Sequence, residues 1–227
     1  MRRYRIIASG ILLALLALPV LSEEGSGRPK AAAVSPSLKG DPLVGKLKSE
    51  DERCQECHGH DGNAQDIEDG VGNIGKYPRL AGQLPSYILK QMRDFRNGVR
   101  SNDTMLVMAR SVSDKDVADI AAYFSGQKIS NEKANLLPQG RRLFVEGDGV
   151  RGIPACAGCH GEAGQGIQQG EVIYPRLSGQ HQRYLAKQLT EWRLAERKNS
   201  LGGIMNEIAK KLTDSDIEQL SSYLSGL

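Results

Sequence analysis

The sequence predicts an all-α fold made of two small domains in tandem. The chain has 227 residues, enough for one large domain or two small ones. The segment 77–83 (Tyr-Pro-Arg-Leu-Ala-Gly-Gln) recurs at 174–180 as Tyr-Pro-Arg-Leu-Ser-Gly-Gln. Apolar residues recur every three or four positions, as at Ile88, Met92 and Phe95, and no alternating run is long enough for a useful strand. Aromatic residues make up only 5%, so each core is either lean or partly filled by something other than protein.

The N-terminus is typical of an export signal. Three arginines among the first five residues precede an apolar run over residues 6–21, and small residues follow around Ser22. The run is short for a membrane span of about 20 residues, so we expect cleavage, with an uncleaved anchor as the alternative. Without residues 1–22 the chain holds 27 basic and 27 acidic residues, and this neutral balance argues against nucleic-acid binding. Residues 23–40, rich in Gly, Ser, Pro and Ala, are expected to form a flexible lead.

All four cysteines lie in two Cys-x-x-Cys-His motifs, at 54–58 and 156–160. This spacing is the attachment signature of a c-type haem. The two sulfurs stand on one side of a turn, where they can bond both vinyl groups, and the histidine supplies an axial nitrogen. A thioredoxin-like pair would need a strand–helix unit beside it, and a Cys₂His₂ zinc site needs two histidines per cysteine pair, whereas the chain has only four histidines in total. We therefore expect two covalent haems, attached at Cys54, Cys57, Cys156 and Cys159 and ligated by His58 and His160.

The sixth ligand of each iron is predicted from the repeat. Methionine sulfur favours Fe(II) and is the expected ligand of a low-spin electron carrier. An offset of 100 residues aligns the ends of the two halves and places Met105 opposite Met205. Met108 falls opposite Ile208, which cannot bind iron, so Met108 is expected in the core, with ligation by Met108 as the alternative. Met92 also faces an apolar residue and is expected in the core.

Four residues of the repeated Tyr-Pro-Arg-Leu segments are candidate partners of the haems. The carbonyl groups of Pro78 and Pro175 are candidate acceptors for the second N–H of each axial histidine, with a plain turn as the alternative. Arg79 and Arg176 are candidates to pair with haem propionates, or are surface charges.

Three features occur in one half only. His60 and His181 are not at repeated positions, and both are expected to be exposed. The loop after His58 carries an acidic insertion at 66–69 (Asp-Ile-Glu-Asp). This insertion is predicted to be a solvated loop, with a docking edge for a partner as the alternative.

Each half is expected to form three or more short helices around its haem. The helical pattern of apolar residues that begins after Pro85 ends at Gly98. Ser113 begins a second helix, with Asp116 three positions later. Both patterns recur in the second half, where Pro138 begins its first helix. The predicted organisation is a signal peptide over 1–22, a flexible lead over 23–40, a first domain over 41–127, a linker over 128–137 and a second domain over 138–227.

From about residue 40 to its end, the chain resembles the dihaem cytochrome c4 family. The resemblance rests on two Cys-x-x-Cys-His motifs, two Pro-Arg-Leu-x-Gly-Gln segments, and a methionine seven residues before an apolar-Ser/Thr-Asp helix start. It implies two class I cytochrome c domains, each wrapped around one covalent haem c and related by a pseudo-twofold axis, with the haem edges close together. It implies that Cys54, Cys57, His58 and Met105 serve the first haem and that Cys156, Cys159, His160 and Met205 serve the second.

The resemblance further implies an electron carrier of the periplasm, soluble or loosely attached to the membrane. Its expected partners are redox proteins, with a quinol-oxidising complex or a dehydrogenase upstream and a haem–copper oxidase downstream. Since every iron position is expected to be filled, no enzyme activity is expected. One alternative is the cytochrome subunit of a dehydrogenase or flavocytochrome. Another is a dihaem peroxidase, which would need one five-coordinate haem.

Overall fold

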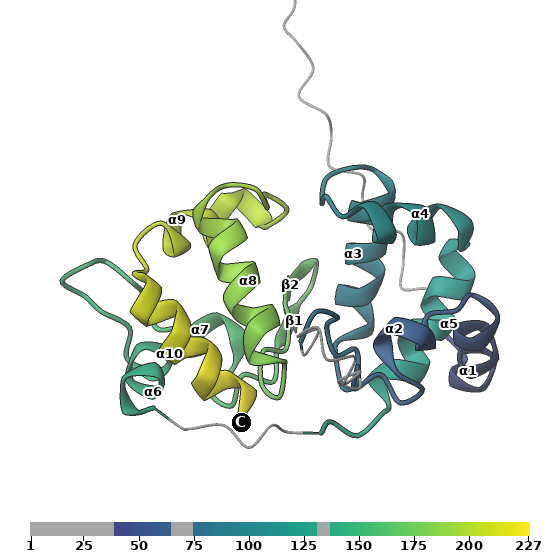
Figure 1. The fold of residues 1–227 in the computed structure, drawn as a ribbon, viewed down its shortest axis with the longest axis horizontal. Helices are drawn as coiled ribbons and strands as arrows, with labels where there is room; N and C mark the ends of the chain where they lie inside the picture. Colours follow the sequence, from purple (N-terminus) through teal and green to yellow (C-terminus); the bar gives the residue numbers. More distant parts are fainter. Residues whose placement is uncertain (1–38, 65–74, 131–136) are drawn as a thin grey trace, which may run out of the picture. The chain divides into compact units, whose positions relative to one another are not determined.

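Two sets of helices, one from each half of the chain, make up the computed structural model (Figure 1). The structure describes residues 39–64, 75–130 and 137–227, all of them within one structural unit, Val34–Leu227. The predicted signal peptide, nearly all of the flexible lead, the acidic insertion and most of the linker lie outside these residues. Within the described ranges, no helix is both long and apolar enough to cross a membrane.

The first half is all-helical in its described part. Its elements are α1 (Pro42–Asp51), α2 (Gln55–His58), α3 (Pro85–Arg96), α4 (Asp103–Ser111) and α5 (Asp114–Ser125). Helices α1 and α3 pack on α5, and α4 packs on α3. The apolar residues predicted to line these helices meet in this core, where Ile88 of α3 packs with Val117 and Phe124 of α5. Met92 packs against the same cluster, as its apolar counterpart in the second half predicted.

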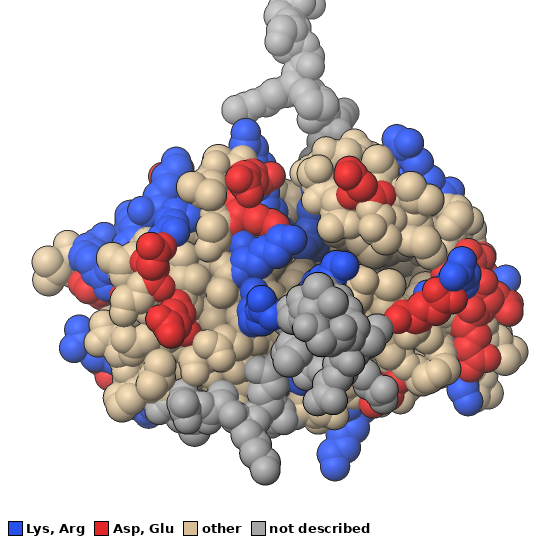
Figure 2. All heavy atoms as spheres, viewed as in Figure 1, with Lys and Arg blue, Asp and Glu red and all other residues tan. Residues whose placement is uncertain are grey.

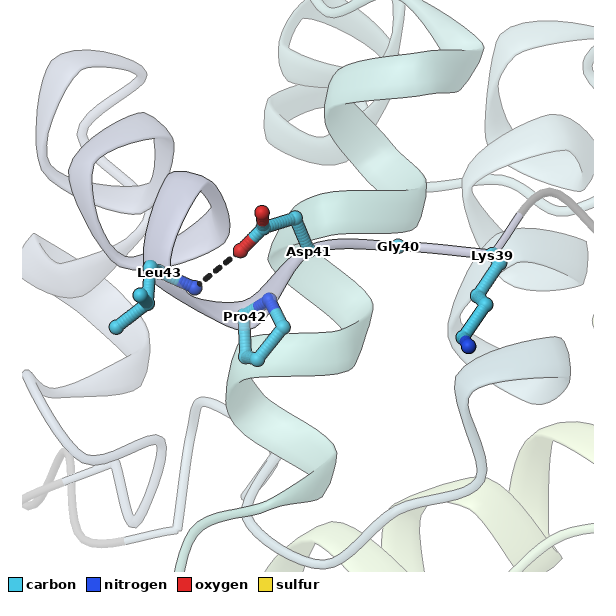
Figure 3. Close-up of a pocket in the computed structure, with 5 residues that line it drawn as sticks. All are labelled: Lys39, Gly40, Asp41, Pro42 and Leu43. Carbon is cyan, nitrogen blue, oxygen red and sulfur yellow. Dashed lines mark hydrogen bonds between the residues drawn. The ribbon is translucent and has the colours of Figure 1, made fainter.

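Helix α1 begins at a capped turn and lies very close to α5. The Asp41 carboxylate accepts a hydrogen bond from the backbone N–H of Leu43 over 2.8 Å (Figure 3). A surface hollow at this turn is lined by residues 39–43. None of these residues is a cysteine, histidine or methionine, the residue types that attach a haem or ligate its iron. At Gly45, a Cβ atom would lie 1.9 Å from the Asp119 carbonyl oxygen, so only glycine allows this helix contact.

The second half repeats the arrangement and adds a small hairpin. Its elements are α6 (Pro138–Val145), α7 (Ala157–His160), β1 (Ile167–Gln169), β2 (Val172–Tyr174), α8 (Gln182–Arg193), η1 (Leu201–Gly203), α9 (Ile204–Ala209) and α10 (Asp214–Ser225). Helices α6 and α8 pack on α10, as α1 and α3 pack on α5. The strands pair antiparallel, with Ile167 opposite Tyr174. This hairpin departs from the purely helical expectation, because strands of three residues are too short to give an alternating pattern.

Each half has its own hydrophobic core. The buried cluster of the second half is drawn from α6, α8 and α10 and includes Phe144, Leu185 and Leu224. The cluster of the first half contains no residue of the second. The fold is therefore two small all-α bodies, each with one Cys-x-x-Cys-His motif packed against its core, since Cys54 and Cys156 both contact their own half's cluster.

Candidate haem sites

The two attachment motifs have the same backbone structure. In each, the chain makes a single helical turn, α2 or α7, that ends at the histidine. The N–H of His58 bonds the Cys54 carbonyl over 3.0 Å, and the N–H of His160 bonds the Cys156 carbonyl over 2.9 Å. A glycine with positive φ ends each turn, so the chain leaves the histidine at once and both cysteines stay beside it.

A proline carbonyl holds each predicted axial histidine. Nδ1 of His58 lies 2.9 Å from the Pro78 carbonyl oxygen, and Nδ1 of His160 lies 2.9 Å from that of Pro175. A carbonyl can only accept, so Nδ1 carries the proton in both rings and Nε2 is left with a lone pair for a metal. Burial lowers the pKa of both histidines, which favours the neutral imidazole that binds iron. The predicted hydrogen bonds between these histidines and the two proline carbonyls are confirmed.

Both cysteine pairs suit thioether bonds better than a bare metal ion. All four cysteines are half-buried and none is in a disulfide. Burial raises the pKa of the Cys54 and Cys156 thiols to about 11, which keeps the sulfur neutral. A bare metal would need thiolates, and the described residues hold no group of three or more His, Cys, Asp or Glu side chains placed to bind one. The donors present therefore fit covalent haem attachment.

The predicted methionine ligands begin corresponding helices. Met105 lies in the first turn of α4, where its N–H bonds the side chain of Asn102 over 2.9 Å. Met205 lies in the first turn of α9, and its N–H bonds the Ser200 hydroxyl over 3.2 Å. Both side chains are half-buried, and so is that of Met108, three residues along α4. Ligation by Met105 and Met205 stays a prediction.

A repeated arginine clamps the segment that follows each methionine. Arg96 of α3 donates to the Val112 carbonyl over 2.7 Å and to Asp114 over 2.5 Å. In the second half Arg193 of α8 donates to the Leu212 carbonyl over 3.1 Å and to Asp214 over 2.6 Å. Each clamp joins the helix after the haem loop to the C-terminal helix of its half. It thereby fixes the chain that carries the predicted sulfur ligand.

Arg79 and Arg176 do not act as simple surface charges. Arg79 is buried, and its Nη1 donates to the Gly179 carbonyl of the other half over 2.6 Å. Arg176 is half-buried, and its Nε donates to the Gly82 carbonyl over 3.0 Å. Both arginines therefore join the two halves, a role that the single sequence did not predict. A contact with propionates stays a prediction.

The two unrepeated histidines differ from each other. His60 is exposed, as predicted. The same prediction is wrong for His181, which is 1% exposed and whose Nε2 donates to the Ala64 carbonyl of the first half over 3.0 Å. His181 lies directly before α8, so it reaches the loop of the other half only because the halves are packed together. No local pattern in the sequence marks such a contact.

Comparisons with known proteins agree with this arrangement. A model of the cytochrome c family matches residues 139–227. Cytochrome c4 of Pseudomonas aeruginosa is 44% identical over 191 residues, which cover 83% of this chain and 89% of that protein. A thiosulfate dehydrogenase electron acceptor of Stutzerimonas stutzeri is 34% identical over 77% of this chain and 78% of its own length.

A solved structure supports the same family. The crystal structure of reduced recombinant cytochrome c4 from Pseudomonas stutzeri aligns with a TM-score of 0.74 and 41% identity, over 83% of this chain and 99% of that one. Its similarity extends over both halves, which agrees with two all-α cytochrome c domains, and the two Cys-x-x-Cys-His motifs fit two covalently bound haem c groups. The chain belongs to the cytochrome c4 family of electron-transfer proteins.

Proposed function

We propose that the protein is a periplasmic dihaem electron carrier, with His58 and Met105 as axial ligands of one iron and His160 and Met205 as those of the other. The observation that carries this proposal is that each half offers one buried neutral imidazole with a free Nε2. Each half also offers a half-buried methionine at the repeated position. When bound, haem supplies one-electron exchange at its iron.

The protein's own residues hold and shield these groups. The Pro78 and Pro175 carbonyls fix the ring planes of the axial histidines, and the Arg96 and Arg193 clamps hold the segments that follow the methionines. With six ligands on each iron no position is left for a substrate. This favours a carrier over a dihaem peroxidase, which needs one open iron.

The proposed location rests on the sequence, and the proposed partners rest on the resemblance to the cytochrome c4 family. The basic and apolar N-terminus supports export to the periplasm, with a cleaved signal over residues 1–22. We propose a haem–copper oxidase as the downstream partner and a quinol-oxidising complex as the upstream one. A second candidate function is service to a dehydrogenase. It is favoured by the relative that is an electron acceptor of thiosulfate dehydrogenase.

A potentiometric titration of the exported protein, followed optically, tests the proposal. We expect two haems per chain, each with a band from methionine sulfur to Fe(III) charge transfer in the oxidised state, and no binding of carbon monoxide to the reduced protein. A high-spin spectrum at either haem, or ready binding of carbon monoxide, would contradict it. Mixing the reduced protein with a haem–copper oxidase, and the oxidised protein with thiosulfate dehydrogenase and thiosulfate, separates the two candidate functions.

A further inference from the structure

One peptide group links the axial histidine of the first half to a glutamine of the second. The carbonyl of the Pro78–Arg79 peptide accepts from Nδ1 of His58 over 2.9 Å. The N–H of the same peptide donates to Oε1 of Gln180 over 2.8 Å. Nε2 of Gln180 then donates to the Arg79 carbonyl over 3.0 Å, so the amide is held at both ends.

The second half contains the equivalent chain of hydrogen bonds, which links its axial histidine to a glutamine of the first half. The Pro175 carbonyl accepts from Nδ1 of His160 over 2.9 Å, and the N–H of Arg176 donates to Oε1 of Gln83 over 2.9 Å. Nε2 of Gln83 donates to the Arg176 carbonyl over 3.0 Å. Both glutamines are buried, so water does not compete for these bonds.

Each glutamine is therefore placed to act on the histidine of the other half. An acceptor at the N–H of an amide polarises that amide and makes its carbonyl oxygen a stronger acceptor. A stronger acceptor at Nδ1 raises the basicity of the imidazole and stabilises the ferric state of an iron bound at Nε2. We propose that Gln180 is a positioning residue that lowers the potential of the first haem, and that Gln83 does the same for the second. This inference rests on the ligation proposed above.

Two neighbouring contacts between the halves do not polarise a peptide group that holds an axial histidine. Arg79 donates through its side chain to the Gly179 carbonyl, and Arg176 donates likewise to Gly82. Neither side-chain bond involves the peptide group that holds an axial histidine. The two glutamines join the halves through that peptide group, so an effect on the potentials separates them from the Arg79 and Arg176 side-chain contacts.

The test measures the potential of each haem in matched variants of the holoprotein. The two haems are distinguished by NMR, from contacts of their methyl protons to side chains of each half, and the Nδ1–H signal of each axial histidine is followed with ¹⁵N-labelled histidine. Gln180→Leu removes the acceptor at similar volume. Gln83→Leu is its counterpart. Gln127→Leu is the control, because Gln127 bonds the Tyr123 carbonyl within its own half.

We expect a crossed result. Gln180→Leu raises the potential of the first haem and shifts the His58 Nδ1–H signal, whereas the second haem stays at its parent value. Gln83→Leu does the reverse, and Gln127→Leu moves neither. A shift confined to the haem of the substituted half, an equal shift of both, or no shift overturns the inference.

A second variant covers the case in which Gln180→Leu does not fold. Gln180→Glu keeps an oxygen acceptor at the Arg79 N–H, so the first haem is expected at or below its parent potential, and an increase counts against the inference.

Measurements on the parent protein distinguish a failure of the proposed glutamine role from a failure of the proposed function. If the parent lacks the sulfur-to-iron band, the proposed ligation fails. If the parent has the band and the glutamine variants leave both potentials unchanged, only the role of the glutamines fails.

Discussion

Arg197 of the second half donates a hydrogen bond to the Tyr87 hydroxyl of the first, with 2.9 Å between Nη2 and the oxygen. The contact is reciprocal, since Arg100 of the first half donates to the Tyr184 hydroxyl over 2.8 Å. Arg197 also lies over the Trp192 ring, 4.5 Å from its centroid. The halves are thus joined by two equivalent arginine–tyrosine bonds, each made by a charged group that needs partners because it is largely removed from water.

We expect Arg197→Ala to lower the free energy of unfolding by about 2–3 kcal/mol, because hydrogen bonds from a charged group and a cation–π contact are lost and their acceptors are left buried. Denaturant unfolding followed by circular dichroism measures this loss. The control is Arg110→Ala on the exposed end of α4, with an expected change of less than about 0.5 kcal/mol. Equal losses in the two variants would mean that the bond to Tyr87 contributes little.

The assignment of Met205 predicts a loss confined to one haem. Methionine sulfur favours Fe(II), so Met205→Ala is expected to lower the potential of the second haem by on the order of 0.2 V, within the roughly 0.8 V that axial ligands span. The first haem, with its separate core, is expected to change little. Spectroelectrochemistry resolves the two waves, and an equal shift of both would contradict independent sites.

Met108→Leu separates the two candidate ligands of the first half. Met105 and Met108 lie three residues apart on α4 and are both half-buried, so the structure gives no preference between them. If Met105 is the ligand, Met108→Leu leaves the sulfur-to-iron band of the first haem in place and Met105→Leu removes it. The opposite pair of results would reassign the ligand to Met108.

The helices of each half were predictable because their signals are local. Ser113 and Thr213 accept hydrogen bonds from the N–H groups three residues later, as the repeated Ser/Thr-Asp starts predicted. Pro85 and Pro138 begin helices, where a missing N–H costs nothing. The attachment motifs were equally clear, since all their atoms lie within five consecutive residues.

The contacts between the halves could not be predicted from local patterns. Gln83, Gln180 and His181 are polar, and polar residues are usually exposed. They are buried here only because each meets a backbone group of the other half. One signal was available in the repeat, because the segments 77–83 and 174–180 are identical at six of seven positions, and a segment kept in both halves suits a symmetric interface.

Asp114 makes stability depend on pH. Hydrogen bonds from Arg96 and Arg93 lower the pKa of this carboxyl below its ordinary 3.8, although partial burial opposes them. A lowered pKa means that the stabilisation is present above pH 3.8 and is lost as the pH falls further. We expect Asp114→Asn to cost less than about 1 kcal/mol at neutral pH, because the side chain is 41% exposed and solvent screens the pair.

The difference in unfolding free energy between Asp114→Asn and the parent is expected to shrink on acidification. Asp214 is the matched control at the repeated position, since it is 91% exposed and bonds Arg193 alone among the described arginines. Asp214→Asn is expected to differ little from the parent at either pH. Denaturant titrations at neutral pH and below 3.8 make the comparison, and a difference that grows on acidification would refute the role of Asp114.

Exposed acidic side chains gather on the two helices beside the first attachment motif. Figure 2 shows red atoms clustered over α1 and α2, the elements that carry the exposed residues Glu50, Asp51 and Glu56. In the second half the corresponding positions hold Gly152, Ile153 and Gly158, none of which is charged. At these positions, a charged small molecule that approaches the first motif therefore meets acidic side chains that the second motif lacks.

We expect the double substitution Glu50→Gln and Asp51→Asn to slow oxidation of the first haem by the cation tris(phenanthroline)cobalt(III) about two- to five-fold at low ionic strength. Oxidation by the anion ferricyanide is expected to become faster, and the second haem is expected to be unaffected by either change. Salt should erase both effects, because the Debye length falls to about 10 Å at 0.1 M. Glu218→Gln, on the exposed face of α10, is the control. Stopped-flow traces that slow with both oxidants would point to a change in the haem itself and not in the field around it.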